Sequence, residues 1–136
     1  MAPPPKSFRV VGIHPVIPSP ELFQQTLEWQ WGGDDESGEA SANVRKHFAG
    51  LYLIEIAIDP PNAEINWSEI TQPVKGQPRS NWQAPYDERE VSQGNWAFFL
   101  HFVDLKQPLY TEAGQFNLPN PTPMPSHLTD HTYEPP

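Results

Sequence analysis

The chain has 136 residues, with 17 acidic and 8 basic side chains and a formal net charge of −9. It contains 18 prolines, 5 Trp, 4 Tyr, 7 Phe and no cysteine, so disulfides and cysteine-ligated metal sites are excluded. The acidic excess argues against a nucleic-acid-binding protein, because Lys and Arg on phosphates supply most of that affinity. The prolines argue against a helical bundle, since proline disrupts a helix interior.

The domain organisation follows from composition. Residues 1–6 form a flexible Pro-rich arm, 7–118 a single β-rich domain, and 119–136 a Pro-rich C-terminal strap or edge strand. The chain has no apolar run long enough to cross a membrane, and its N-terminus lacks the apolar core of a secretory signal. We therefore expect a cytoplasmic protein that does not interact with a membrane.

The first elements are a strand over Phe8–Val16 and a segment with two competing periods over residues 20–31. In that segment, Ser19 before Pro20 is typical of a helix start. The alternation of Trp29 and Trp31 with polar residues is typical of a strand, which we slightly favour. Either structure is expected to bury both tryptophans.

Two later segments predict central strands, because both of their faces are mainly apolar: Leu51–Ile58 and Asn95–Leu105. The first follows an acidic loop at 32–43 and a short helical turn at Val44–Phe48. Between the two strands we expect a weak strand at Glu64–Gln72 and then a long loop without a period. That loop covers residues 73–94.

The end of the chain predicts a hairpin and a proline-rich tail. Leu109–Thr111 and Gln115–Leu118 form the hairpin strands. Residues 119–125 then carry proline at every second position, which removes N–H donors from one side of an extended chain only. This spacing favours a covering strap or capped edge strand over a polyproline arm for a partner.

Together these elements predict a mainly β, single-domain antiparallel β-sandwich or open barrel with long Pro-rich loops. The alternative is an α+β fold with one helix, at about residues 20–31, packed on a sheet.

The strongest candidate binding surface lies in the 73–94 loop. Its aromatic, arginine and acidic side chains are typical of a recognition surface: Arg79, Trp82, Tyr86, Asp87 and Arg89. A second candidate is the acidic cluster Asp34, Asp35 and Glu36, which would suit a basic partner.

Two weaker hypotheses involve histidines. His101 with Asp87 or Glu88 would supply a general base and its orienting carboxylate, although a buried core histidine is the more ordinary interpretation. His127 and His131 have the i, i+4 spacing of a metal pair on a helix, but they lie between prolines in the tail.

No nucleotide-binding, nucleophile-elbow or zinc-helix motif occurs, and we expect no cofactor. The leading hypothesis is therefore a small, soluble, non-catalytic protein that engages a protein partner through the 73–94 loop, with a basic partner suited to its acidic surface. The alternatives are a small-molecule-binding or hydrolytic enzyme with a pocket under that loop, and a divalent-metal-binding protein using the C-terminal histidine pair. The sequence predicts no particular oligomeric state.

Overall fold

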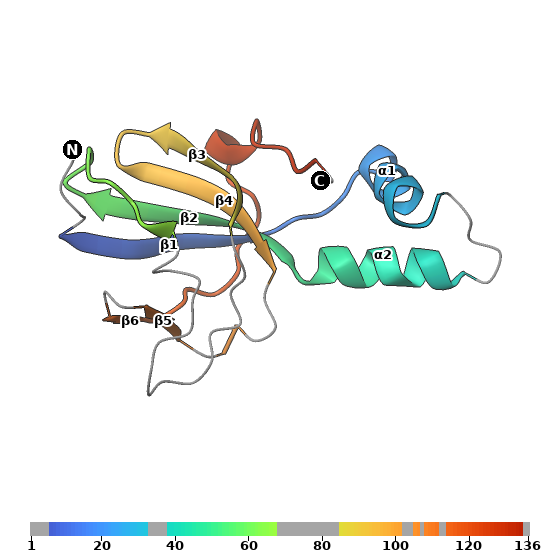
Figure 1. The fold of residues 1–136 in the computed structure, drawn as a ribbon, viewed down its shortest axis with the longest axis horizontal. Coiled ribbons are helices and arrows are strands. Elements are labelled where there is room, and N and C mark those ends of the chain that lie inside the picture. The colour runs from blue at the N-terminus through green and yellow to red at the C-terminus, as the bar shows by residue number, and fades with distance from the viewer. Residues whose placement is uncertain are drawn as a thin grey trace.

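The computed structural model describes residues 6–32, 38–67, 85–101, 105–106, 108–111 and 114–134. Its centre is a four-stranded antiparallel sheet of order β1-β2-β4-β3 (Figure 1). The strands are β1 (Ser7–Pro15), β2 (Leu51–Asp59), β3 (Tyr86–Ser92) and β4 (Asn95–His101). The mainly β fold is confirmed, and the sheet is not closed into a barrel.

The two predicted central strands are confirmed. β2 pairs with β1 on one side and with β4 on the other, and Ile54 lies opposite Phe98 while Leu53 lies opposite Phe99. All four of these side chains are almost completely buried, although neighbours along a strand point to opposite faces. Apolar residues on both faces therefore placed these strands correctly.

Residues 20–31 form a helix, α1 (Pro20–Trp31), so the preference for a strand is wrong and the alternative is right. The hydroxyl of Ser19 accepts a hydrogen bond from the N–H of Leu22 at 3.1 Å. Gly32 then ends the helix in the left-handed region, with φ 64°. Burial of Trp29 is also wrong, since 51% of this residue is exposed.

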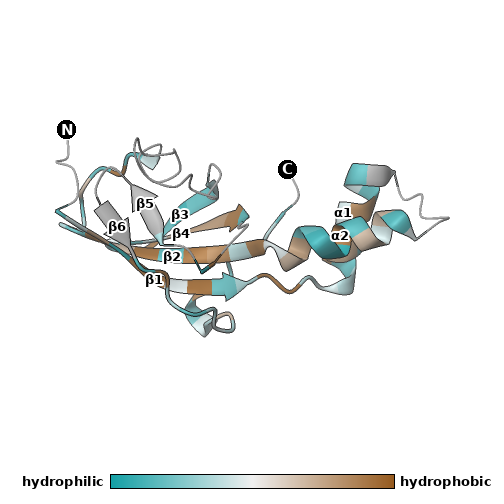
Figure 2. Cartoon of the chain, turned by 90° about the horizontal axis from the view of Figure 1, so that it is seen from below, coloured by the Kyte–Doolittle hydropathy of each residue, from teal (hydrophilic) through white to brown (hydrophobic). Residues whose placement is uncertain are grey.

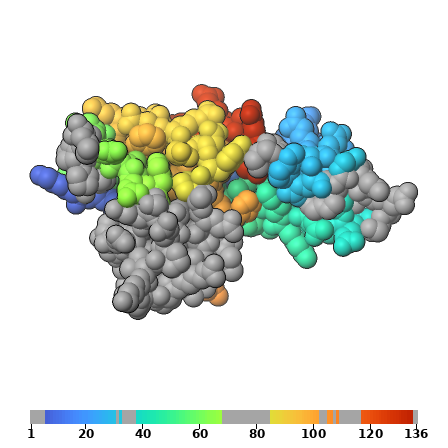
Figure 3. Space-filling model, in the orientation of Figure 1, coloured from blue at the N-terminus to red at the C-terminus, as the bar shows by residue number. Residues whose placement is uncertain are grey.

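A second helix, α2 (Glu39–Ala49), is longer than the predicted turn and begins inside the predicted acidic loop. It buries Ala40, Val44 and Phe48, which recur every fourth residue and form one stripe. The two helices pack against each other and extend from one end of the sheet (Figures 1 and 3).

The predicted 73–94 loop is wrong over its second half, because Tyr86–Ser92 forms the edge strand β3. Its register shifts between Tyr86 and Arg89, where Asp87 adopts a positive φ of 54°. Charged side chains and a bulge are common at sheet edges, and they hid the strand's period. Residues 73–84 lie outside the described part of the chain.

The hairpin prediction is confirmed by β5 (Leu109–Thr111) and β6 (Gly114–Phe116), which pair as a separate antiparallel ribbon. Residues 64–66 of the predicted weak strand have no regular structure, and 68–72 lie outside the described residues. The second layer of a sandwich stays a prediction.

The two faces of the sheet have different covers. The tryptophan face carries Ile54, Ile56 and Phe98 and packs against Trp67 and Trp96. The cavity face carries Leu51, Leu53, Ala97 and Phe99. Both helices and the end of the chain cover it. Hydrophobic residues run along the strands between these covers (Figure 2).

Residues 117–134, called the C-terminal segment below, end the described chain and are not in a strand. The N–H of Thr122, which lies between two prolines, donates to the carbonyl of Ile13 in β1 at 2.9 Å. The short 3-10 helix η1 (Ser126–Leu128) buries Leu128 against the cavity face, and the chain after it buries Tyr133 there. This segment positions the candidate site.

Candidate functional site

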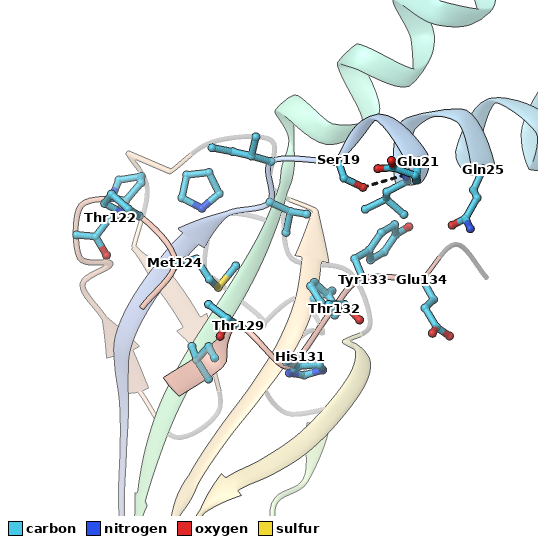
Figure 4. Close-up of a pocket in the computed structure, with 18 residues that line it drawn as sticks. Ser19, Glu21, Gln25, Thr122, Met124, Thr129, His131, Thr132, Tyr133 and Glu134 are labelled. Atoms are coloured by element: carbon cyan, nitrogen blue, oxygen red, sulfur yellow. Dashed lines mark hydrogen bonds between the residues drawn. The ribbon is translucent and has the colours of Figure 1, made fainter. Parts of the chain in front are cut away.

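A cavity of about 680 Å³ lies between the start of α1 and the C-terminal segment (Figure 4). One side is formed by the link from β1 to α1 and the first turns of α1, and the other by the C-terminal segment. The described residues that line it are Pro15, Val16, Ile17, Ser19, Glu21, Leu22, Gln25, Phe99, Pro121, Thr122, Pro123, Met124, Leu128, Thr129, His131, Thr132, Tyr133 and Glu134.

The walls are mainly apolar and belong to the core of the cavity face. Phe99, Leu128 and Tyr133 are buried members of that core, and Leu22 and Met124 pack against it. Ile17, which also lines the cavity, is 86% exposed and makes its rim apolar as well. The cavity is thus an apolar opening in the hydrophobic core.

Several polar groups of the lining already hold hydrogen bonds within the protein. The hydroxyl of Ser19 caps α1, and that of Thr129 donates to the carbonyl of Ser126 at 2.8 Å. The Nε2–H of His131 donates to the carbonyl of Asp87 at 2.8 Å. Each of the first two bonds is local to one wall, and the third joins the C-terminal segment to β3. Two other lining hydroxyls lie beside histidines: Oγ1 of Thr122 is 3.2 Å from Nδ1 of His14, and the hydroxyl of Tyr133 is 3.1 Å from Nε2 of His47.

The charge of the lining is negative. Glu21 and Glu134 are both exposed, and Figure 4 shows them on the same side of the cavity as Gln25. Among the described lining residues there is no Lys or Arg. The cavity therefore combines apolar walls with two carboxylates.

His131 attaches the C-terminal segment to β3. Its side chain is 3% exposed, its ring lies 4.9 Å from that of Phe99, and its Nδ1 is buried without a described partner. Burial lowers the pKa of His131, against the opposing hydrogen bond to the backbone of Asp87. The guanidinium of Arg89 donates two hydrogen bonds, of 3.1 and 3.0 Å, to the two carboxylate oxygens of Asp87.

A second attachment joins α2, β4 and the C-terminal segment. Nε2 of His47 and the hydroxyl of Tyr133 are hydrogen bonded at 3.1 Å, and the rings of His47 and His101 lie 4.6 Å apart. Burial lowers the pKa of both histidines and raises that of Tyr133. Nε2 of His101 is buried without a described partner.

A third attachment centres on Glu55 in β2. Its carboxylate accepts a hydrogen bond from Nε2 of His127 at 2.8 Å and lies 3.8 Å from Nε2 of His14. Nδ1–H of His14 in turn donates to the carbonyl of Thr122 at 3.2 Å. Two histidines therefore link the start of the C-terminal segment to the sheet.

The structure brings some of the predicted binding residues together. Tyr86, Asp87 and Arg89 meet at the C-terminal segment, where the hydroxyl of Tyr86 donates to the carbonyl of Glu134 at 2.9 Å. Glu88 is exposed. The remaining candidates lie outside the described residues: Asp34, Asp35, Glu36, Arg79 and Trp82.

The histidine hypotheses meet a different geometry. His101 lies against His47, whereas the Asp87 carboxylate is held by Arg89. His127 bonds to Glu55 and His131 to Asp87, so the two side chains of the predicted metal pair have separate partners. Within the described ranges, no group of three or more His, Cys, Asp or Glu side chains is placed to hold a metal ion.

Sequence reasoning missed the residues that form the cavity, including Ile17, Leu22, Met124 and Tyr133. Apart from Phe99, they come from two segments about 100 positions apart in the sequence, and no local period joins them. The prolines near these residues were the one available signal. Proline fixes φ and is disfavoured inside helices and central strands, so it marks extended segments outside regular structure.

Comparison with known proteins identifies no relative: no protein family, curated protein or solved structure matches this chain. A separate finding concerns membranes. The helices in the described part of the chain are too short or too polar to span a bilayer.

Proposed function

We propose that this protein is a soluble, non-catalytic binding protein for a basic protein partner. An apolar side chain of the partner enters the cavity, and a neighbouring Lys or Arg pairs with Glu21 and Glu134 at its edge. The observation that carries the proposal is one cavity that combines apolar walls, acidic side chains and no described Lys or Arg.

The size of the cavity supports this function. A volume of about 680 Å³ lies within the range of roughly 300–1,000 Å³ that is usual for binding pockets. Buried apolar anchors supply most of the energy at protein interfaces, and a cavity of this size has room for an apolar side chain of a partner. The exposed Ile17 beside it extends the apolar contact.

The net charge of −9 supports a basic partner, because opposite charge accelerates encounter and selects among partners. We place the contact with the partner at the cavity and not at the predicted 73–94 loop. Described residues of the loop, Tyr86 and Asp87, hold one wall in place instead.

Selection from a random peptide library at low salt tests the proposal. The expected peptides combine one or two bulky apolar residues with an adjacent Lys or Arg. The wild type should bind them more weakly as salt is raised, and the Glu21→Gln/Glu134→Gln variant should bind them about tenfold more weakly at low salt. The Met124→Trp variant, which puts a bulkier side chain into the cavity, should weaken binding.

The matched control is Glu64→Gln/Glu88→Gln, which removes the same charge from two exposed residues that do not line the cavity. It should bind the selected peptides nearly as well as the wild type. Peptides without basic residues, or equal binding by the Met124→Trp variant, would contradict the proposal.

A further inference from the structure

All five histidines of the chain surround the C-terminal segment. His127 and His131 belong to it, His14 bonds to Thr122, His47 bonds to Tyr133, and His101 packs on His47. They form two groups, one at each end of the segment, and the two groups have different surroundings.

The first group, His14 and His127, flanks the carboxylate of Glu55. Nε2 of His14 and Nε2 of His127 lie 3.8 and 2.8 Å from the carboxylate oxygens. The N–H of Thr122 also donates to the carbonyl of Ile13 at 2.9 Å, and this backbone hydrogen bond involves no titratable group. Residues 122–127 are therefore attached through at least one contact that does not titrate.

The second group holds the other end through His131, His47 and His101. Since Nε2 of His131 already donates to Asp87, a second proton must go to the buried Nδ1, which has no described acceptor. The charged groups beside this imidazole are Asp87, which favours the proton, and Arg89, which opposes it. Burial outweighs the attraction and lowers the pKa of His131.

His47 and His101 oppose protonation for a second reason. Their ring centroids lie 4.6 Å apart in an edge-on arrangement, so two imidazolium charges would repel. Among the described residues, His47 also contacts the hydroxyl of Tyr133 and the ring of Phe48, and neither carries a negative charge at neutral pH. Acid therefore weakens the support on which Tyr133 rests.

We propose that acid releases residues 131–134 from the cavity face while residues 122–127 stay attached, so that the C-terminal segment opens one wall of the cavity. Release begins as the pH falls below about 6.5, where histidine takes up protons. Four of the cavity's lining residues then move away, so acid also discharges the occupant. Only this last step rests on the proposed function.

Proton NMR of the protein without a ligand tests the opening between pH 8 and pH 5. Contacts between the rings of Tyr133 and Phe99, whose centroids are 5.2 Å apart, report the releasing end. Contacts between Thr122 and His14 report the attached end. We expect the first set to disappear and the second to persist. As the pH falls through this range, the ratio of open to closed protein should rise by up to about tenfold for each unit by which a histidine pKa is lowered in the closed protein.

Two variants identify the groups responsible. His101→Gln and His131→Gln should each reduce the rise in the open-to-closed ratio, whereas His127→Gln, whose imidazole is 58% exposed, should leave it intact. The proposal is overturned by persistence of the Tyr133 contacts at pH 5, by simultaneous loss of both sets, or by a wild-type response in both variants. Because no peptide is present, failure of peptide binding would leave this result standing.

Discussion

The two faces of the sheet are built from the same strands but are covered in different ways. On the tryptophan face, Trp67 packs edge-on against Trp96 and Phe98, with ring centroids 5.9 and 5.1 Å apart. On the cavity face, the cover includes both helices and the C-terminal segment, which is attached through histidines and borders the cavity. One face is thus covered by aromatic rings packed edge-on, whereas the other retains a cavity beside its cover.

The largest effect should separate two neighbouring phenylalanines. Phe98 is fully buried on the tryptophan face, whereas Phe99 lies on the cavity face beside existing space. Phe98→Ala should lower the free energy of unfolding by about 3–5 kcal/mol, and Phe99→Ala by clearly less, because its neighbours and solvent fill the gap more easily. Urea unfolding measures both. Equal losses would contradict the difference between the faces.

Tyr133 should show how much its packing contributes compared with its hydroxyl. Tyr133→Ala removes ring contacts with Phe48, Phe99 and Tyr86 and should cost about 2–4 kcal/mol of unfolding free energy. Tyr133→Phe removes only the hydrogen bond to His47 and should cost about 0.5–1.5 kcal/mol. A Phe variant as unstable as the Ala variant would place the main energy in the hydroxyl.

Overall stability should fall with acid. The pKa values of His47, His101 and His131 are lower in the folded protein than in the unfolded chain, so the unfolded chain binds more protons below about pH 6.5. The free energy of unfolding should therefore decrease as the pH falls from 7.5 through the lowered values. Urea titrations at several pH values measure the slope, which His101→Gln should reduce. A slope of opposite sign would refute this prediction.

The smallest effect concerns the helix that borders the cavity. Ser19→Ala removes the cap of α1 and should cost about 1 kcal/mol in thermal unfolding, while Ser19→Asp restores an acceptor and should recover most of it. An Ala variant of wild-type stability would show that the packing of Leu22 and Leu27 alone fixes the helix start.

The sequence predicted the central strands because their apolar faces are a local property of eight or so residues. The helix α1 was harder, since Phe23 and Leu27 fit both a helical and an alternating period. Its decisive feature is the cap at Ser19 and Pro20, a local signal that outweighs the alternation of the tryptophans with polar residues. Partial exposure of Trp29 shows that aromatic side chains do not always mark the core.

Local patterns in the sequence could not predict the candidate site. Its walls come from the β1–α1 link and from the C-terminal segment, which meet only because Thr122 pairs with Ile13 and Leu128 packs on the sheet. Tyr86 and Asp87 were predicted to be important, but as a binding surface rather than as contacts that hold the segment. Such roles depend on long-range packing.

The central claim is that the cavity receives an apolar side chain beside a basic one. A crystal structure of the protein with the tightest selected peptide, grown at neutral pH, tests it most directly. We predict an apolar side chain among Leu22, Phe99 and Met124, and a Lys or Arg within 4 Å, roughly the ion-pair limit, of Glu21 or Glu134. A peptide bound on another surface, with the cavity unfilled, would contradict the account.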